Sequence, residues 1–395
     1  MTLSRVGIDR RRFLRLGTAA GVAFGGCSAE TAPPPASGSA GMRYRRLGRT
    51  GLEVSEIAFG AHGVDNAPLM GAAFEAGINT FCTSGQYLDG REEEALGEAI
   101  RRVGAPRERL VLVTGNETPR GTSRRAILEA VDASLRRLHT DHIDLYYTAQ
   151  VCSPADLRVE ALFEAIDEAK RAGKVGHLAM SGHCGGMQPA LNAAIDDGRF
   201  GMLFTRYDFV SYPDVDGILQ RAAERGVGTI AFKTTAGNRQ REIEDLQKGG
   251  LSFRQATLKW ALSHPYVSSV AVTLTSFDDL REVTAAAGSR LTEAESRMLR
   301  RYAGRMHDRY CRFCRACEAL CPHGVAVAEI NRYAMYFADY GREKRAMTLY
   351  GVLPPPRRAA ACDDCPAPCE AACPFGREVR TGLRAAHRQL SFSHA

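Results

Sequence analysis

The chain has 395 residues, long enough for two or three domains, and its 45% hydrophobic and 25% charged residues exclude a disordered, collagen-like or polytopic membrane protein. The formal net charge of +7 is mildly basic, but the arginines are scattered rather than gathered in one block, which counts against nucleic-acid binding. Twelve cysteines are many for this length, and their spacing decides whether they indicate disulfides or bound metal.

Residues 1–27 resemble a twin-arginine export signal. In Asp9-Arg10-Arg11-Arg12-Phe13-Leu14-Arg15, two adjacent arginines are followed, after one residue, by Phe-Leu and a basic residue. The weakly apolar run from Leu16 to Gly26 is too short to span the ~30 Å of hydrocarbon in a bilayer. The resemblance implies export as a folded protein, commonly with a cofactor already bound. A basic N-terminus in a cytosolic protein is the open alternative.

The apolar run ends at Phe24-Gly25-Gly26-Cys27, which resembles a lipobox. Cys27 would then be lipid-modified, with simple cleavage nearby as the alternative. Residues 28–41 are rich in Pro, Ala, Ser and Gly and predict a flexible linker. We therefore expect a periplasmic protein or one anchored at the outer face, with membrane contact only through the signal or a lipid anchor.

From Met42 onward, short apolar runs alternate with amphipathic helical patterns. Eight such units over about 250 residues predict a (β/α)8 TIM barrel, an α/β fold, over residues 42–303. No G-x-G-x-x-G follows the first strand, which counts against a doubly wound sheet. The strand candidates are Glu56–Phe59, Asn79–Cys82, Leu110–Thr114, Ile143–Tyr147, Val175–Ser181, Met202–Thr205, Gly228–Phe232 and Val267–Thr273.

The same segment resembles the aldo-keto reductase family, with motifs in the family's order and spacing. The matching stretches are Tyr44-Arg45-Arg46-Leu47-Gly48-Arg49-Thr50-Gly51-Leu52, Gly77-Ile78-Asn79-Thr80-Phe81, Glu93-Glu94-Ala95-Leu96-Gly97, Leu135-Arg136-Arg137-Leu138, Ile143-Asp144-Leu145-Tyr146 and Leu258-Lys259-Trp260-Ala261-Leu262.

The resemblance implies a catalytic set of Asp, Tyr, Lys and His, of which one member survives. The tyrosine is Tyr87, the expected proton donor, whereas the aspartate falls on Cys82, the lysine on Gly115 and the histidine on Ala149. We name Tyr87 and Cys82 as the candidate catalytic residues. An unassisted phenol has a pKa of about 10, roughly three units from the value suited to acid catalysis at pH 7. Ordinary carbonyl reduction should therefore be slow.

Several residues that bind NADPH in the family are also replaced in this sequence. Ser181 keeps its place after the fifth strand, and Tyr207 stands where the family stacks the nicotinamide ring. The asparagine falls on Gly182, the glutamine on Phe204 and the phosphate-loop glycine on Thr273. These losses count against an NADPH site, as does export, because soluble nicotinamide cofactors are not expected outside the cytoplasm.

Three cysteines and a histidine follow the predicted strands on the face where this architecture places its active sites. Cys82, Cys152 and Cys184 follow strands two, four and five, His62 follows strand one, and a further histidine, His183, adjoins Cys184. Such a set could form a redox-active thiol site or a metal site. The alternative is three unrelated buried cysteines, which are common in protein cores.

Two further cysteine runs, each closed by a proline, lie in residues 304–395. The spacings C-x2-C-x2-C-x3-C-P and C-x2-C-x3-C-x3-C-P predict two [4Fe–4S] clusters, with structural zinc and disulfides as alternatives. The ligands are Cys311, Cys314, Cys317 and Cys321 in the first run, and Cys362, Cys365, Cys369 and Cys373 in the second.

In two-cluster ferredoxins the fourth cysteine of each run binds the other cluster. The expected sets are therefore Cys311, Cys314 and Cys317 with Cys373, and Cys362, Cys365 and Cys369 with Cys321. The long interval between the runs has helical periodicity over Val325–Tyr340 and resembles an α-helical ferredoxin module. We expect a small, mainly helical, ferredoxin-like domain with two clusters.

The sequence favours an exported iron–sulfur oxidoreductase. Electrons would pass through the clusters to or from a small molecule at the barrel mouth, and the partner would be a redox protein or a membrane electron carrier. One alternative is an electron-transfer or binding subunit whose barrel has lost its chemistry. Another is an NADPH-dependent carbonyl reductase with a remodelled site.

Overall fold

The structure, a computed structural model, describes residues 41–182, 184, 186–211, 215–237, 240–247 and 250–391. The predicted export signal, Cys27, all of the predicted linker except Gly41, and His183 lie outside the described residues.

Eight parallel strands close into a barrel in the order β10-β3-β4-β5-β6-β7-β8-β9. The first and last strands meet through pairs such as Val270 with Ile57, so no sheet edge is left open. Each strand overlaps one of the eight strands expected from the sequence, and the predicted barrel is confirmed. The strands are β3 (Ile57–Gly60), β4 (Thr80–Cys82), β5 (Val111–Glu117), β6 (Ile143–Ala149), β7 (Val175–Gly182), β8 (Phe200–Arg206), β9 (Gly228–Phe232) and β10 (Ser269–Thr273).

The helices around the barrel begin at side-chain caps that their sequences supply. The Ser123 and Ser252 hydroxyls accept a backbone N–H at the starts of α4 and α9, and Thr292 forms a capping box with Glu295 at α11. In the described part of the chain, no helix is long and apolar enough to cross a membrane. The helices are α2 (Ala67–Glu75), α3 (Arg91–Val103), α4 (Arg124–Arg137), α5 (Glu160–Arg171), α6 (Gln188–Asp197), α7 (Asp216–Glu224), α8 (Gln240–Glu244), α9 (Phe253–Leu262), α10 (Phe277–Thr284) and α11 (Glu293–Arg305).

A short antiparallel hairpin, which the sequence did not predict, lies at the amino ends of the barrel strands. It pairs β1 (Tyr44–Arg46) with β2 (Glu53–Ser55). Leu47, between the two strands, is fully buried and joins the apolar core inside the barrel. The hairpin therefore closes the inside of the barrel at the end opposite the strands' carboxyl ends.

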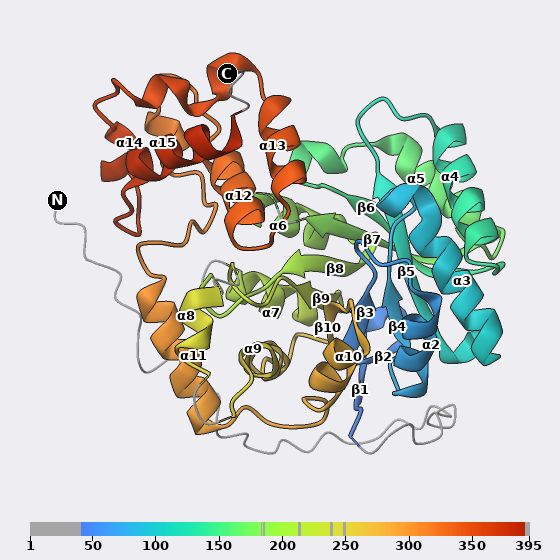
Figure 1. Cartoon of the computed structure of the whole chain (residues 1–395). Helices are drawn as coiled ribbons and strands as arrows, with labels where there is room; N and C mark the ends of the chain where they lie inside the picture. The colour runs from blue at the N-terminus through green and yellow to red at the C-terminus, as the bar shows by residue number, and fades with distance from the viewer. Residues whose placement is uncertain are drawn as a thin grey trace.

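Residues 306–391 form a smaller helical unit without a strand, which we call the cap. Its helices α12–α15, orange to red in Figure 1, gather on one side of the barrel. The cap has its own apolar core, which includes Ile330 and Tyr333 of α12, while Met335 of the same helix joins the core of the barrel. The helices are α12 (Val327–Ala338), α13 (Glu343–Gly351), α14 (Pro368–Ala371) and α15 (Val379–Leu390).

Candidate functional site

A cavity of about 650 Å³ lies at the carboxyl ends of the barrel strands, a size typical of small-molecule sites. Its walls come from the ends of the strands and the loops that follow them, and α12, α13 and the turn between them add residues from the cap. The residues that line the cavity include His62, Cys82, Tyr87, Tyr147, Ser181, Phe204, Lys233, Arg254, Tyr336, Arg342 and Arg345.

Tyr87, the predicted proton donor, lines this cavity. Its ring packs against His62 with 4.5 Å between the ring centroids, and its hydroxyl shares a hydrogen bond with Tyr147. Burial raises the pKa of Tyr87, so the phenol is held in its protonated form. In this setting Tyr87 can donate a hydrogen bond, but it is a weaker acid than a free phenol.

Gly115 and Gly182, where the resemblance would place a lysine and an asparagine, have no room for a side chain. A Cβ atom on Gly115 would lie 1.9 Å from the carbonyl oxygen of Tyr147, and one on Gly182 would lie 2.5 Å from that of Val151. No side chain fits at either position without a backbone shift. The packing around the cavity therefore excludes the two side chains that the resemblance implies.

Cys82 lines the cavity at the end of β4 as a buried, free thiol. Burial raises its pKa well above the usual value, and a protonated thiol is a poor nucleophile and a poor metal ligand. Cys152 and Cys184 are joined to each other by a disulfide. A metal site built from all three cysteines is therefore wrong, and the disulfide instead ties the loop after β6 to the loop after β7.

The predicted cofactor-binding residues lie in different environments. Ser181 lines the cavity near Phe204, whose ring packs against Phe232 at 4.7 Å between centroids. Tyr207 is fully buried and is not among the residues that line the cavity. Its hydroxyl donates to Asp216 at 2.7 Å. In this placement its ring is not available to stack on a nicotinamide.

Lys233 and Tyr336 form a pair that joins the barrel to the cap inside the cavity. Lys233 directly follows β9, and its Nζ donates to the Tyr336 hydroxyl at 3.3 Å. Burial lowers the pKa of Lys233. Burial alone would raise the pKa of Tyr336, but the charges of Lys233, Arg332 and Arg345 hold it below its usual value. Sequence analysis missed this pair, although the position of Lys233 just after a predicted strand placed it at the mouth.

His62 meets the cap at the same corner of the cavity. Its Nε2 lies 3.0 Å from Nη1 of Arg345. Burial, with Arg342, Arg345 and Lys233 nearby, lowers the pKa of His62 to about 3, so the imidazole is neutral at pH 7. Beneath it, Glu92 accepts the backbone N–H of the next residue, Gly63, and burial raises the pKa of this carboxyl to about 7.

The first predicted set of cluster ligands comes together in the cap. Cys311, Cys314, Cys317 and Cys373 line one small pocket, although the last lies in the second cysteine run. Burial, with the other three thiols nearby, raises the pKa of Cys317 to about 12. These four side chains therefore face one another, as the exchange of fourth ligands predicts.

The second set is gathered in the same way. Burial, with the thiols of Cys321, Cys365 and Cys369 nearby, raises the pKa of Cys362 to about 11. All eight cysteines carry free thiols. Among the described residues, no group of three or more His, Cys, Asp or Glu side chains could hold a metal ion. A [4Fe–4S] cluster sets a different spacing from a single ion, because its four thiolates bind different iron atoms.

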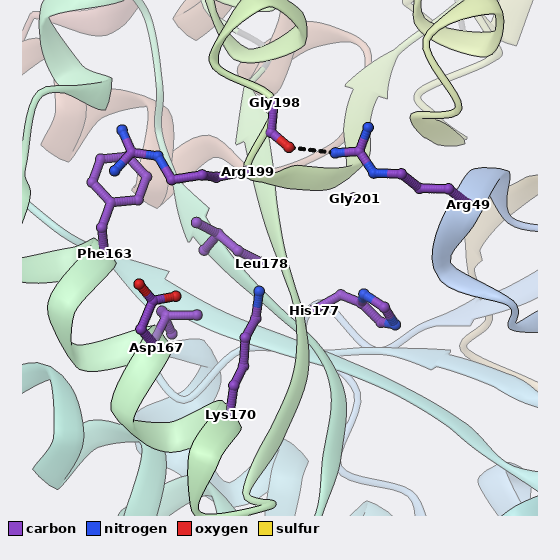
Figure 2. A pocket seen from close by; sticks show the side chains of 10 residues that line it. Arg49, Phe163, Asp167, Lys170, His177, Leu178, Gly198, Arg199 and Gly201 are labelled. Carbon is purple, nitrogen blue, oxygen red and sulfur yellow. Dashed lines mark hydrogen bonds between the residues drawn. The ribbon is translucent and has the colours of Figure 1, made fainter.

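A second pocket, of about 250 Å³, lies at the opposite end of the barrel (Figure 2). Arg199 lies over the Phe163 ring and pairs with Asp197, and Arg49 donates to the Gly198 carbonyl at 2.5 Å. Both arginines therefore already have partners within the fold. Lys170 of this pocket provides a control position for the experiments below.

Comparisons with known proteins match parts of this chain. Residues 63–248 match the aldo/keto reductase family. The versiconal hemiacetal acetate reductase of Aspergillus parasiticus is 26% identical over 333 residues, 65% of this chain and 96% of that protein. The uncharacterized oxidoreductase YrpG of Bacillus subtilis (strain 168) is 27% identical over 313 residues, 65% of this chain and 95% of that protein.

A solved structure, the aldo-keto reductase AKR11C1 from Bacillus halodurans in its holo form, resembles this chain with a TM-score of 0.55 and 23% identity. The likeness covers 66% of this chain and 96% of that one, and it shows the fold. The chain is therefore similar to aldo/keto reductases in sequence over part of its length, and the structural likeness shows the shared barrel fold.

Proposed function

We propose that this chain is an exported iron–sulfur oxidoreductase of the aldo-keto reductase superfamily. Electrons pass through two [4Fe–4S] clusters to or from a small molecule in the cavity at the barrel mouth. The observation that carries the proposal is the gathering of eight free thiols into two sets of four, each with three cysteines of one run and one of the other.

The residues fit the clusters by their chemistry. Each set offers four thiols, the ligand type and number that a [4Fe–4S] cluster takes, and half of the eight are buried while the rest are partly buried. A bound cluster supplies one-electron transfer. The protein's own contribution is to shield the thiols from water, to bind the small molecule next to the cap, and to hold protons at the hydroxyls of Tyr87 and Tyr336.

The cavity supports an oxidoreductase over an inactive docking subunit. A barrel kept only as a docking body has no need of a cavity of about 650 Å³ with polar side chains from two domains. The NADPH-dependent alternative is disfavoured, because Tyr207 is buried away from the cavity and Gly115 and Gly182 leave no room for the family's side chains.

Export is the part of the proposal that rests on the amino terminus. The disulfide between Cys152 and Cys184 supports it, because disulfides persist in oxidising compartments such as the periplasm. In that location the electron partner is a redox protein or a membrane electron carrier. Expression of the full chain, followed by fractionation with and without a functional twin-arginine pathway, tests this part separately.

The central experiment is anaerobic purification of the full chain with iron and sulfide quantification. Two clusters predict about eight iron and eight sulfide atoms per chain. We expect dithionite to produce the electron paramagnetic resonance signals of reduced clusters and NADPH to produce none. A colourless preparation without iron would overturn the proposal, and cluster reduction by NADPH would restore the reductase alternative.

A further inference from the structure

Three cations from two domains meet at one corner of the mouth cavity. Lys233 comes from the barrel, and Arg342 and Arg345 come from the cap. All three act together on His62, which places their charges around one imidazole. In the described part of the chain, none of the three forms an ion pair, although Lys233 donates to Tyr336 and Arg345 contacts His62.

Four acidic residues also line the cavity, namely Glu117, Asp279, Glu282 and Asp339. Asp279 and Glu282 are both paired with Arg254, at 2.5 and 3.4 Å. Glu92 is near Arg342, but burial raises the pKa of its carboxyl to about 7 and two backbone N–H groups already bind it. Three cations and no carboxylate are among the groups that shift the pKa of His62, so positive charge predominates around this imidazole.

Holding like charges together in a partly buried site costs free energy that a bound anion offsets. Lys233 adds a second observation, because its backbone φ of 55° lies in the left-handed region that non-glycine residues rarely adopt. Such conformations are retained mainly where the position of a side chain matters. The backbone and the charges both indicate that Lys233 is placed for a ligand.

We propose that the cavity binds a small organic acid, with its carboxylate among Lys233, Arg342 and Arg345. The arginines can form paired hydrogen bonds to the carboxylate, and Lys233 adds a point charge from the opposite domain. The neighbouring hydroxyls of Tyr87 and Tyr336 serve the rest of the molecule as hydrogen-bond donors. This inference rests on the proposed function, because it names the class of its small-molecule substrate.

The test compares benzoate with benzamide, which share a shape and differ in charge, on the anaerobically purified full chain by isothermal titration calorimetry. We expect benzoate to bind at least about tenfold more tightly than benzamide. The preference should disappear in Lys233→Met and fall in Arg345→Gln, so that each domain is tested by one variant. Lys170→Met, in the pocket at the other end of the barrel, should leave it unchanged.

Equal affinities for the two probes, or no binding of either, would overturn the anion site. The iron content of the same samples separates this failure from failure of the proposed function. Full clusters without a charge preference remove only the organic-acid inference. A charge preference in protein without clusters keeps the anion site and removes the electron-transfer function.

Discussion

At the scale of single residues, His62 and Glu92 give folding stability two opposing responses to pH. The pKa of His62 is lowered to about 3, below its ordinary value of 6.5, so stability decreases as the pH falls through this range. The pKa of Glu92 is raised from 4.5 to about 7. The stability that its protonated carboxyl gives the fold is therefore lost as the pH rises through that range. Between about pH 4.5 and 6.5 the two responses oppose each other.

Replacing one residue at a time should reveal each response. In Glu92→Gln only His62 still responds, so we expect the free energy of unfolding to fall more steeply on acidification below about pH 6.5. The slope should reach at most about 1.4 kcal/mol per pH unit. His62→Gln should change the slope in the other direction, because only Glu92 then responds. Urea unfolding at pH 5, 6 and 7 measures the slopes, and identical slopes in both variants would contradict the assignment.

Tyr336 is expected to ionise below the ordinary phenol pKa of about 10. Burial opposes this, but the charge and hydrogen bond of Lys233, with Arg332 and Arg345, outweigh it. An ultraviolet difference titration at 295 nm of the parent against Tyr336→Phe should isolate this phenol. Lys233→Met should raise its pKa, whereas Lys170→Met should not. A phenol that titrates at the same pH in the presence and absence of Lys233 would show that the pair is structural only.

The candidate site shows where sequence reasoning stops at this scale. Tyr87, Cys82 and Ser181 were expected at the mouth, because each follows a predicted strand, and all three line the cavity. Tyr207 also follows a strand but turns into the packing around Trp260. Arg345 could not be predicted, because its contact with His62 joins residues 283 positions apart through the docking of two domains.

At the scale of elements, the two cysteine runs exchange their last members. The grouping of Cys373 with Cys311, Cys314 and Cys317 means that neighbours in sequence belong to different sites. The exchange therefore links the two ends of the cap in a way that a pair of separate cluster loops would not.

Serine substitutions in pairs should reveal this grouping. Under the proposed function, Cys317→Ser and Cys373→Ser should each remove one cluster and about half of the iron, and the double variant should lose no more than either single one. Cys317→Ser combined with Cys321→Ser should lose nearly all of the iron, although these residues are four positions apart. Iron quantification after anaerobic purification measures both. A reversed pattern would show that each run binds its own cluster.

Regular elements were the part of the fold most open to sequence reasoning. The eight barrel strands are apolar runs with helices between them, and each prediction overlaps the observed strand. The β1–β2 hairpin was not predicted, because its strands of three residues are too short to establish an alternating pattern. Its role depends on Leu47 entering the barrel, which is a tertiary contact.

At the scale of the whole molecule, the barrel and the cap differ in what holds them together. The barrel has closed strand pairing and a large apolar core, whereas the core of the cap is smaller and includes three of the cysteines themselves, Cys317, Cys362 and Cys369. Removal of the clusters should therefore loosen the cap more than the barrel.

Amide hydrogen exchange before and after iron chelation tests this difference. We expect faster exchange in α12, α13 and α15 of the metal-free protein, while β5 to β8 keep their protection. Loss of protection throughout the chain would show that the two parts unfold as one unit. Unchanged exchange in the cap would show that its helices do not depend on the cysteine ligands.

The division of α12 between two cores has a consequence for the order in which the molecule is made. The ribosome delivers every strand of the barrel before the helix that carries Tyr336, so the pocket stays unfinished until the last quarter of the chain has emerged. A polypeptide released early would possess a closed barrel and no complete pocket. The ability to bind a ligand in this pocket thus requires that synthesis has passed Arg345, the last residue that lines it.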